Sequence, residues 1–140
     1  MSLVGSPQEL PRLAREADYV VNCLPLTAQT TGIFDRAFFA HMKPTAYFVS
    51  VGRGRSTVTA DLDAALAAGT IAGAGLDVVD PEPLPPEDPL WRQPHVIITP
   101  HVSAMTAVSE EQRDALLREN LRRYVAGEPL LSVVDIERGY

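Results

Sequence analysis

The fold is decided by residues 48–83, which read FVSVGRGRSTVTADLDAALAAGTIAGAGLDVVDPEP and are completed by ITPH at residues 98–101. Apolar runs at residues 47–51, 74–79 and 96–99 are rich in β-branched side chains and are predicted to be strands. These runs lack a clean alternation of apolar and polar residues. That pattern favours strands that are covered on both faces, as in a parallel sheet.

A helix is predicted between the first two of these strands. Thr59 can serve as its N-cap, Asp61 and Asp63 fall in its first turn, and Gly69 can end it. The segment is therefore a β-α-β unit. Such units indicate an α/β protein, here a partial Rossmann-type parallel sheet with flanking helices that lacks the first strands and the glycine-rich loop.

Three ionisable residues follow the three predicted strands: Arg53, Glu82 and His101. Because ligands of open α/β sheets bind at the carboxyl ends of the strands, we expect these side chains to converge on one site. Taken singly, the arginine could be a solvated turn residue, the glutamate a surface charge and the histidine a capping or core residue. Asp77 is harder to dismiss, because a carboxylate within an apolar run needs a partner or a ligand.

The composition limits the possible partners and the compartment. A chain of 140 residues with 46% hydrophobic and 21% charged residues is typical of one soluble domain. A net charge of −6 argues against nucleic acid and anionic membranes, and no apolar run is long enough to span a bilayer. The single cysteine, Cys23, lies in an apolar run, which predicts a buried, inert thiol and fits a reducing cytoplasm. No Cys/His cluster has metal-ligand spacing, so no metal site is predicted.

The remaining elements are predicted from their composition and caps. Residues 18–24 are expected to form a buried strand, and Asp35 can cap the helix that follows it. The final helix can begin at either Thr106 or Ser109. Its apolar stripe at residues 117–125 is expected to pack against the sheet or a second subunit.

Four motifs, in order along the chain, resemble those of one known family. They are LPLTAQTTGIF at residues 24–34, SVGRG at 50–54, GLDVVDPEPLP at 75–85 and ITPHVSA at 98–104. Together they are similar to the NAD-binding domain of the D-isomer-specific 2-hydroxyacid dehydrogenases. The closing VVDIERGY at residues 133–140 is similar to the ends of the glyoxylate/hydroxypyruvate reductase members. The resemblance covers nearly the whole chain.

This resemblance implies an oxidoreductase that uses NAD or NADP and transfers a hydride to or from a small 2-hydroxy/2-oxo acid. Arg53 would grip the substrate carboxylate with its planar fork of N–H groups. His101 would be the general acid/base, and the carboxylate of Glu82 would favour its protonated form. The positions implied to line the dinucleotide are Leu24, Pro25, Thr30, Val51, Gly52 and Asp77, the last of them near the nicotinamide carboxamide.

The sequence departs from the family at the phosphate-binding loop. Its closest match to G-x-G-x-x-G, at residues 73–78, has valine at the position of the third glycine. This segment leads into a strand rather than a helix. The family's separate substrate-binding domain is also missing. We therefore expect residues 1–140 to be the C-terminal portion of the NAD-binding domain, including the final helix and tail, with little activity alone.

One expectation follows from the missing strands, and one alternative function stays open. An open sheet edge or face near residues 18–24 favours a homo-oligomer. A non-catalytic, corepressor-like interaction module of the same fold is the alternative to an enzyme. Keeping Arg53, Glu82 and His101 together favours the enzyme, because a binding module has no chemical need for all three.

Overall fold

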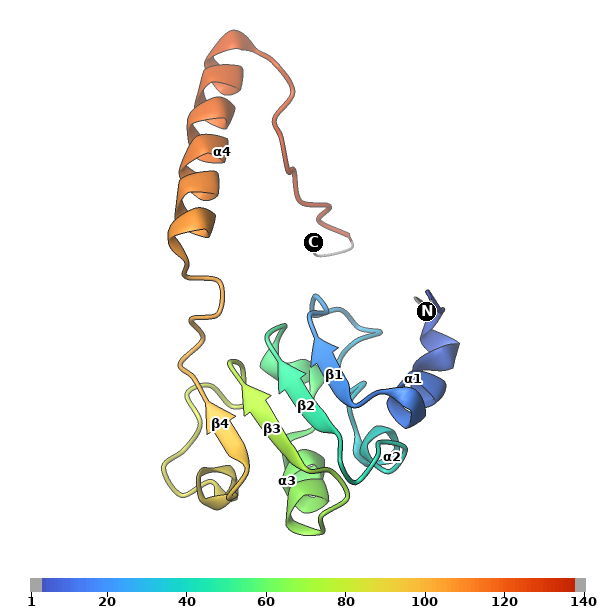
Figure 1. Cartoon of the computed structure of the whole chain (residues 1–140). Helices are drawn as coiled ribbons and strands as arrows, with labels where there is room; N and C mark the ends of the chain where they lie inside the picture. Colours follow the sequence, from blue (N-terminus) through green and yellow to red (C-terminus); the bar gives the residue numbers. More distant parts are fainter. Residues whose placement is uncertain (1–3, 138–140) are drawn as a thin grey trace. The chain divides into compact units, whose positions relative to one another are not determined.

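The computed structural model describes residues 4–137 and divides the chain into two compact units, Met1–His101 and Val102–Tyr140. The first unit holds a four-stranded parallel sheet in the order β1-β2-β3-β4 (Figure 1). Its strands are β1 (Tyr19–Asn22), β2 (Tyr47–Ser50), β3 (Gly73–Leu76) and β4 (Val96–Ile98). Its helices are α1 (Leu10–Glu16), α2 (Arg36–Phe39) and α3 (Thr59–Ala67), with 3-10 turns η1 (Pro7–Glu9), η2 (Gly54–Ser56) and η3 (Pro89–Arg92). The predicted α/β class with a parallel sheet is confirmed.

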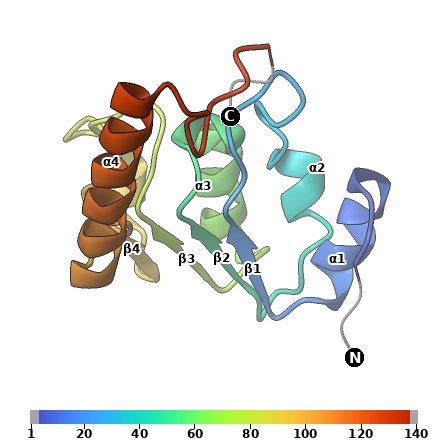
Figure 2. The ribbon, with the colours of Figure 1, turned by 90° about the horizontal axis from the view of Figure 1, so that it is seen from above.

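Only one face of this sheet is covered within residues 4–101. Val20, Phe48 and Ala74 stand in register on the buried face, where α2 and α3 lie (Figure 2). On the opposite face Tyr19 and Val21 are 68% and 57% exposed. The prediction of strands covered on both faces is therefore wrong for this unit. Successive side chains of a strand point to opposite faces, and in β1 and β2 burial alternates with that period of two.

The core is built around the ring of Phe48, which is fully buried at the centre of β2. The rings of Phe34, Phe38 and Phe39 surround it, with centroids 5.1, 6.3 and 5.3 Å away. Two of these rings belong to α2. Aromatic packing of this kind holds α2 against the sheet.

The caps explain where the helices begin. Asp35 accepts a hydrogen bond of 2.9 Å from the backbone N–H of Phe38, as predicted for the start of α2. The prediction for α3 is wrong, because Val58 is its N-cap and Thr59 is the first helical residue. The Thr59 hydroxyl instead donates to the carbonyl oxygen of Asp80 at 2.6 Å, a partner that only the tertiary fold provides.

Cys23 is exposed, so the prediction of a buried thiol is wrong. It directly follows the last residue of β1, and the period of two places it on the side of the exposed Tyr19 and Val21. The buried side chains of this strand are Val20 and Asn22.

The second unit contains α4 (Ala107–Ala126) and an extended tail. Thr106 is the N-cap, and its hydroxyl accepts from the N–H of Ser109 at 3.1 Å, which decides between the two predicted starts. Gly127 ends the helix in the left-handed conformation, with φ at 70°. The apolar stripe is exposed within this unit, and the last residues of the closing motif, 138–140, lie outside the described residues. No helix among residues 4–137 is long and apolar enough to cross a membrane.

Candidate active site at the carboxyl edge of the sheet

The predicted site residues all follow strand ends at one edge of the sheet. Ser50, Leu76 and Ile98, the last residues of β2, β3 and β4, stand in register. Arg53 lies three residues after β2, and His101 lies three residues after β4. Because the three strands are parallel and end level with one another, these two residues emerge on the same side of the molecule.

Glu82 and His101 form a direct pair. The Nδ1 atom of the histidine lies 2.7 Å from Oε1 of the glutamate, and both side chains are partly exposed. A carboxylate can only accept a hydrogen bond, so Nδ1 carries the hydrogen of this contact. Nε2 is then the ring atom that can take up or release a proton.

The backbone of His101 is held in an unusual conformation. Its φ is +55°, in the left-handed region that residues other than glycine seldom adopt. Its N–H donates to the carbonyl oxygen of Asp77 at 3.0 Å, which ties this residue to the end of β3. Strained backbone of this kind is often found at functional sites, where the surrounding structure enforces it.

Asp77 is a buried carboxylate, with 5% of its surface exposed. Its Oδ1 accepts a hydrogen bond of 2.6 Å from the Thr99 hydroxyl, and its N–H donates to the carbonyl oxygen of Ser50. Hydrogen bonding of this kind is what makes a buried carboxylate tolerable. The structure therefore confirms that this residue has partners, as its position in an apolar run requires.

Arg53 stands apart from the Glu82–His101 pair. Its Nη1 donates to the carbonyl oxygen of Gly52 at 2.8 Å, and no ion pair or hydrogen bond to either partner is found among residues 4–137. A guanidinium has five N–H donors, so most of them remain available to an anion.

The turn that carries Arg53 is locked to the loop that carries Glu82. A Cβ atom on Gly54 would lie 1.8 Å from the carbonyl oxygen of Val79, so only glycine allows this approach. The same loop is also held by α3, whose first residue, Thr59, donates a hydrogen bond from its hydroxyl to the carbonyl oxygen of Asp80. The position of the arginine relative to the pair is thus set by backbone packing.

The residues predicted to line a dinucleotide lie around the same edge. Leu24 and Thr30 border a mainly apolar pocket of about 550 Å³ that α1 closes on one side. The Thr30 hydroxyl donates to the carbonyl oxygen of Pro25 at 2.7 Å. Val51 extends the pairing of β2 through its N–H to the Asn22 carbonyl oxygen, and Gly52 packs on the backbone of Leu24. An apolar pocket beside strand ends fits part of a dinucleotide, although the sequence supplies no glycine-rich loop for its pyrophosphate.

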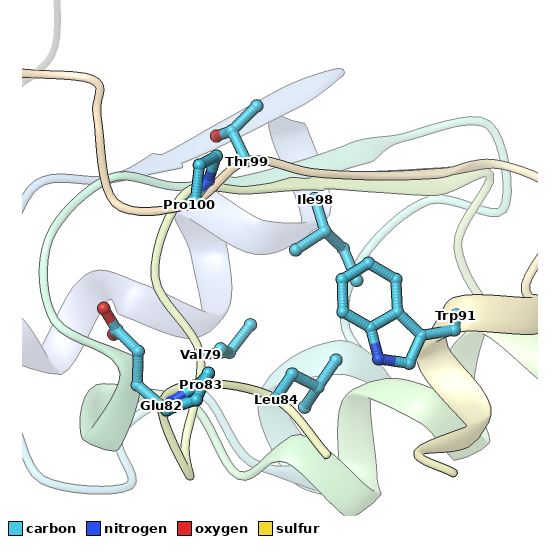
Figure 3. Close-up of a pocket in the computed structure, with 8 residues that line it drawn as sticks. All are labelled: Val79, Glu82, Pro83, Leu84, Trp91, Ile98, Thr99 and Pro100. Carbon is cyan, nitrogen blue, oxygen red and sulfur yellow. The ribbon is translucent and has the colours of Figure 1, made fainter. Parts of the chain in front are cut away.

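A second pocket, of about 420 Å³, adjoins the Glu82–His101 pair. Figure 3 shows the Glu82 carboxylate at one end of it and the Trp91 ring at the other. The indole N–H of Trp91 donates to the carbonyl oxygen of Pro85 at 2.9 Å, which fixes that wall. The full lining is Val79, Glu82, Pro83, Leu84, Trp91, Ile98, Thr99 and Pro100, in which the glutamate is the one ionisable group.

Sequence reasoning missed several residues that shape the site. Thr99 supports Asp77, Gly54 permits the close approach of the two loops, and Asn22 is buried at the end of β1. The signal for Asn22 was available, because an amide within an apolar strand needs buried partners. Nothing local to the sequence indicated the partners of the other two. Among the residues that the structure describes, no group of three or more His, Cys, Asp or Glu side chains could hold a metal ion.

A parallel sheet with flanking helices and polar groups at its carboxyl edge is typical of an α/β protein of the Rossmann type. Comparison with known proteins identifies the family within this fold class. The family model described as D-isomer specific 2-hydroxyacid dehydrogenase, NAD binding domain, matches residues 2–103. The chain therefore belongs to this family, and the cofactor class that was predicted, NAD or NADP, is confirmed at the level of the family's domain.

Several relatives are similar over most of the chain. An uncharacterized protein from Corynebacterium melassecola is 47% identical over 129 residues, which are 89% of this chain and 41% of that protein. A glyoxylate/hydroxypyruvate reductase A from Yersinia enterocolitica is 38% identical over 133 residues, 95% of this chain and 42% of that protein. The chain thus spans less than half the length of these curated relatives.

Solved structures agree with the sequence comparison. A D-isomer specific 2-hydroxyacid dehydrogenase from Xanthobacter autotrophicus, in complex with NADPH and MES, is 41% identical with a TM-score of 0.86. It matches 95% of this chain and 54% of its own. An NADPH-dependent glyoxylate/hydroxypyruvate reductase from Sinorhizobium meliloti, in complex with NADP and sulfate, is 38% identical with a TM-score of 0.85. It matches 95% of this chain and 43% of its own.

Proposed function

We propose that the chain is part of an NAD(P)-dependent oxidoreductase acting on a small 2-hydroxy/2-oxo acid of the glyoxylate or hydroxypyruvate type. The observation that carries this proposal is the 2.7 Å contact between Glu82 and His101. This pair lies at the carboxyl edge of the sheet, the edge at which Arg53 follows β2. The names of the reductase relatives support the substrate class. A nicotinamide dinucleotide, when bound, supplies or accepts the hydride at the carbon that bears the oxygen.

The residues of this chain would handle the charge and the proton. Arg53 would hold the substrate carboxylate through two parallel N–H···O contacts, which orients the neighbouring carbonyl. During reduction Nε2 of His101 would give its proton to the carbonyl oxygen, while during oxidation it would remove the hydroxyl proton. Glu82 would fix the ring through Nδ1 and offset the positive charge of the imidazolium.

The dinucleotide contacts are proposed for Leu24, Pro25, Thr30, Val51 and Gly52, and Asp77 is proposed to lie near the carboxamide. The apolar pocket beside Leu24 and Thr30 supports this assignment. The sequence has no glycine-rich loop for the pyrophosphate, so we propose that the 140-residue chain alone turns over little substrate.

The carboxylate-binding role is testable on the chain as it is. Oxalate, a small dicarboxylate, should bind the unmodified chain and should bind Arg53→Ala at least tenfold more weakly, since the loss of a bidentate ion pair is worth about 1.5 to 3 kcal/mol. Arg55→Ala is the matched control, because Arg55 is an exposed arginine two residues away. Equal oxalate affinity in the two variants would remove the proposed role of Arg53.

The inactivity of the chain alone has its own test. Purified chain with NADPH or NADH and glyoxylate should show almost no loss of reduced cofactor. Turnover typical of a complete enzyme would contradict this expectation. A non-catalytic interaction module remains the alternative, and it predicts neither oxalate binding nor any effect of Arg53→Ala.

We also propose that the chain self-associates and that it is cytoplasmic. The exposed side chains of Tyr19 and Val21, on an edge strand of the sheet, support association with a second copy. Val21→Asp should then shift the chain toward the monomer in light scattering, whereas Val108→Asp, at a residue of α4 that is 63% exposed, should not. A monomeric unmodified chain would contradict the proposal.

A further inference from the structure

One side-chain amide is almost fully buried at the carboxyl edge of the sheet, that of Asn22 at the end of β1. Its Nδ2 donates to the hydroxyls of Ser50 and Ser56, at 3.0 and 2.8 Å. Its Oδ1 accepts from the backbone N–H of Leu24 at 3.0 Å. The amide therefore joins the turn after β1, the end of β2 and the η2 turn, and both of its hydrogens are used.

Ser56 extends this network to Arg53. Its hydroxyl donates to the Arg53 carbonyl oxygen at 2.6 Å, and its backbone N–H donates to the same oxygen at 3.1 Å. A hydroxyl has a single proton, so Ser56 donates to the arginine and accepts from Asn22. The hydrogen bonds thus run in one direction from Asn22 through Ser56 to Arg53.

The two turns that this network joins also touch directly. A Cβ atom on Gly52 would lie 2.8 Å from the Leu24 carbonyl oxygen and 3.1 Å from Oδ1 of Asn22. Ser50 and Ser56 are fully buried, so water does not substitute for these hydrogen bonds.

We infer that Asn22 and Ser56 are positioning residues that hold the Arg53 turn at a fixed place beside the Leu24 turn. The inference rests on the proposed function, in which Arg53 binds the acid and Leu24 contacts the dinucleotide. The side chain of Arg53 is long and partly exposed, so an unanchored backbone would leave its guanidinium in many orientations. Anchoring its carbonyl oxygen orders the guanidinium for a two-point grip on a carboxylate.

The structure offers a matched pair of variants. Ser50→Ala and Ser56→Ala each remove a fully buried hydroxyl that accepts from Asn22, and only Ser56 contacts Arg53. We expect both variants to lower the urea midpoint reported by Trp91 fluorescence, Ser56→Ala by more, because the Ser56 hydroxyl makes two hydrogen bonds and the Ser50 hydroxyl makes one with this network. Only Ser56→Ala should lower the NMR order parameters of the Arg53 and Gly54 amides.

The order parameters decide the inference without any enzyme assay. Loosening of the Arg53 turn in Ser56→Ala alone supports it, while equal loosening in both variants, or none in either, overturns it. If Ser56→Ala does not fold, Asn22→Asp serves instead, because a carboxylate still accepts from Leu24 but cannot donate to Ser56. A tight Arg53 turn in Asn22→Asp would overturn the inference as well.

Oxalate binding links the network to function. Ser56→Ala should bind oxalate roughly tenfold more weakly than the unmodified chain, and Ser50→Ala should bind it equally well. If the unmodified chain binds no oxalate, the proposed function fails, while the order parameters still decide whether Ser56 positions Arg53.

Discussion

Gly54→Ala should separate the arginine from the Glu82–His101 pair. The new Cβ atom would lie 1.8 Å from the carbonyl oxygen and 2.2 Å from the carbonyl carbon of Val79, whereas ordinary contact begins at 3.4 Å. The two backbones must therefore move apart by about 1.6 Å, and neither is the flexible end of a side chain. We expect a loss of about 3 kcal/mol in the free energy of unfolding, at the upper end for overpacking.

Gly75→Ala is the control for this change. A Cβ atom there would come no closer than 3.9 Å to any neighbour, so the variant should be neutral or more stable by about 0.5 kcal/mol. Urea unfolding followed by the fluorescence of Trp91 measures both, because this is the one tryptophan of the chain and it lies in the first unit. If Gly54→Ala is as stable as Gly75→Ala, the turn at Gly54 does not pack against the backbone of Val79 as closely as described.

Function should respond to the same displacement. If Arg53 binds a carboxylate as proposed, oxalate should bind Gly54→Ala at least tenfold more weakly than it binds Gly75→Ala, because the displaced turn no longer holds the guanidinium for a two-point contact. Unchanged oxalate affinity in a folded Gly54→Ala would refute the claim that this contact sets the place of Arg53.

Three further changes test other parts of the chain. Phe48→Ala should cost about 4 kcal/mol in urea unfolding because this ring is fully buried among three others, and Phe48→Leu should cost clearly less. Hydrogen bonds from Arg122 and a neighbouring arginine lower the pKa of Glu119 from 4.5 to about 2. The stabilisation that comes from this depressed pKa is present above pH 4.5 and is lost as the pH falls toward 2. Acid should therefore reduce the circular-dichroism signal of helix α4. The variant Glu119→Gln should show less of this pH dependence. Asn120 exchanges two hydrogen bonds with the backbone of Leu131, so Asn120→Ala should speed proteolysis after residue 127 while leaving the first unit unchanged.

Part of the geometry at the carboxyl edge of the sheet was readable from the sequence. Arg53, Glu82 and His101 follow predicted strands, and the structure brings the last two into contact at 2.7 Å. Asp35 caps α2 as expected, since its acceptor and the receiving N–H are three residues apart. Predictions held where the interacting groups are close along the chain or where the strand order places them at one edge.

The errors share one physical cause. Thr59 was predicted to cap its own helix, but its hydroxyl donates to Asp80, which lies 21 residues away. Cys23 was predicted to be buried from its apolar neighbours, although the face that a strand residue occupies decides its exposure. Local patterns describe what a side chain could do, while distant segments decide which of these possibilities is realised.

The order of short apolar runs, helices and glycine turns determined that this protein has a parallel α/β sheet, and its motifs determined the family. The tertiary structure alone decided which face of the sheet is covered, how closely Gly54 approaches Val79, and that Asn22 meets Ser56 across 34 residues of sequence. Periodicity and caps act over a few residues and can be read along the chain. Steric fit and buried hydrogen bonds need two partners in space, and the sequence does not state which segments become neighbours.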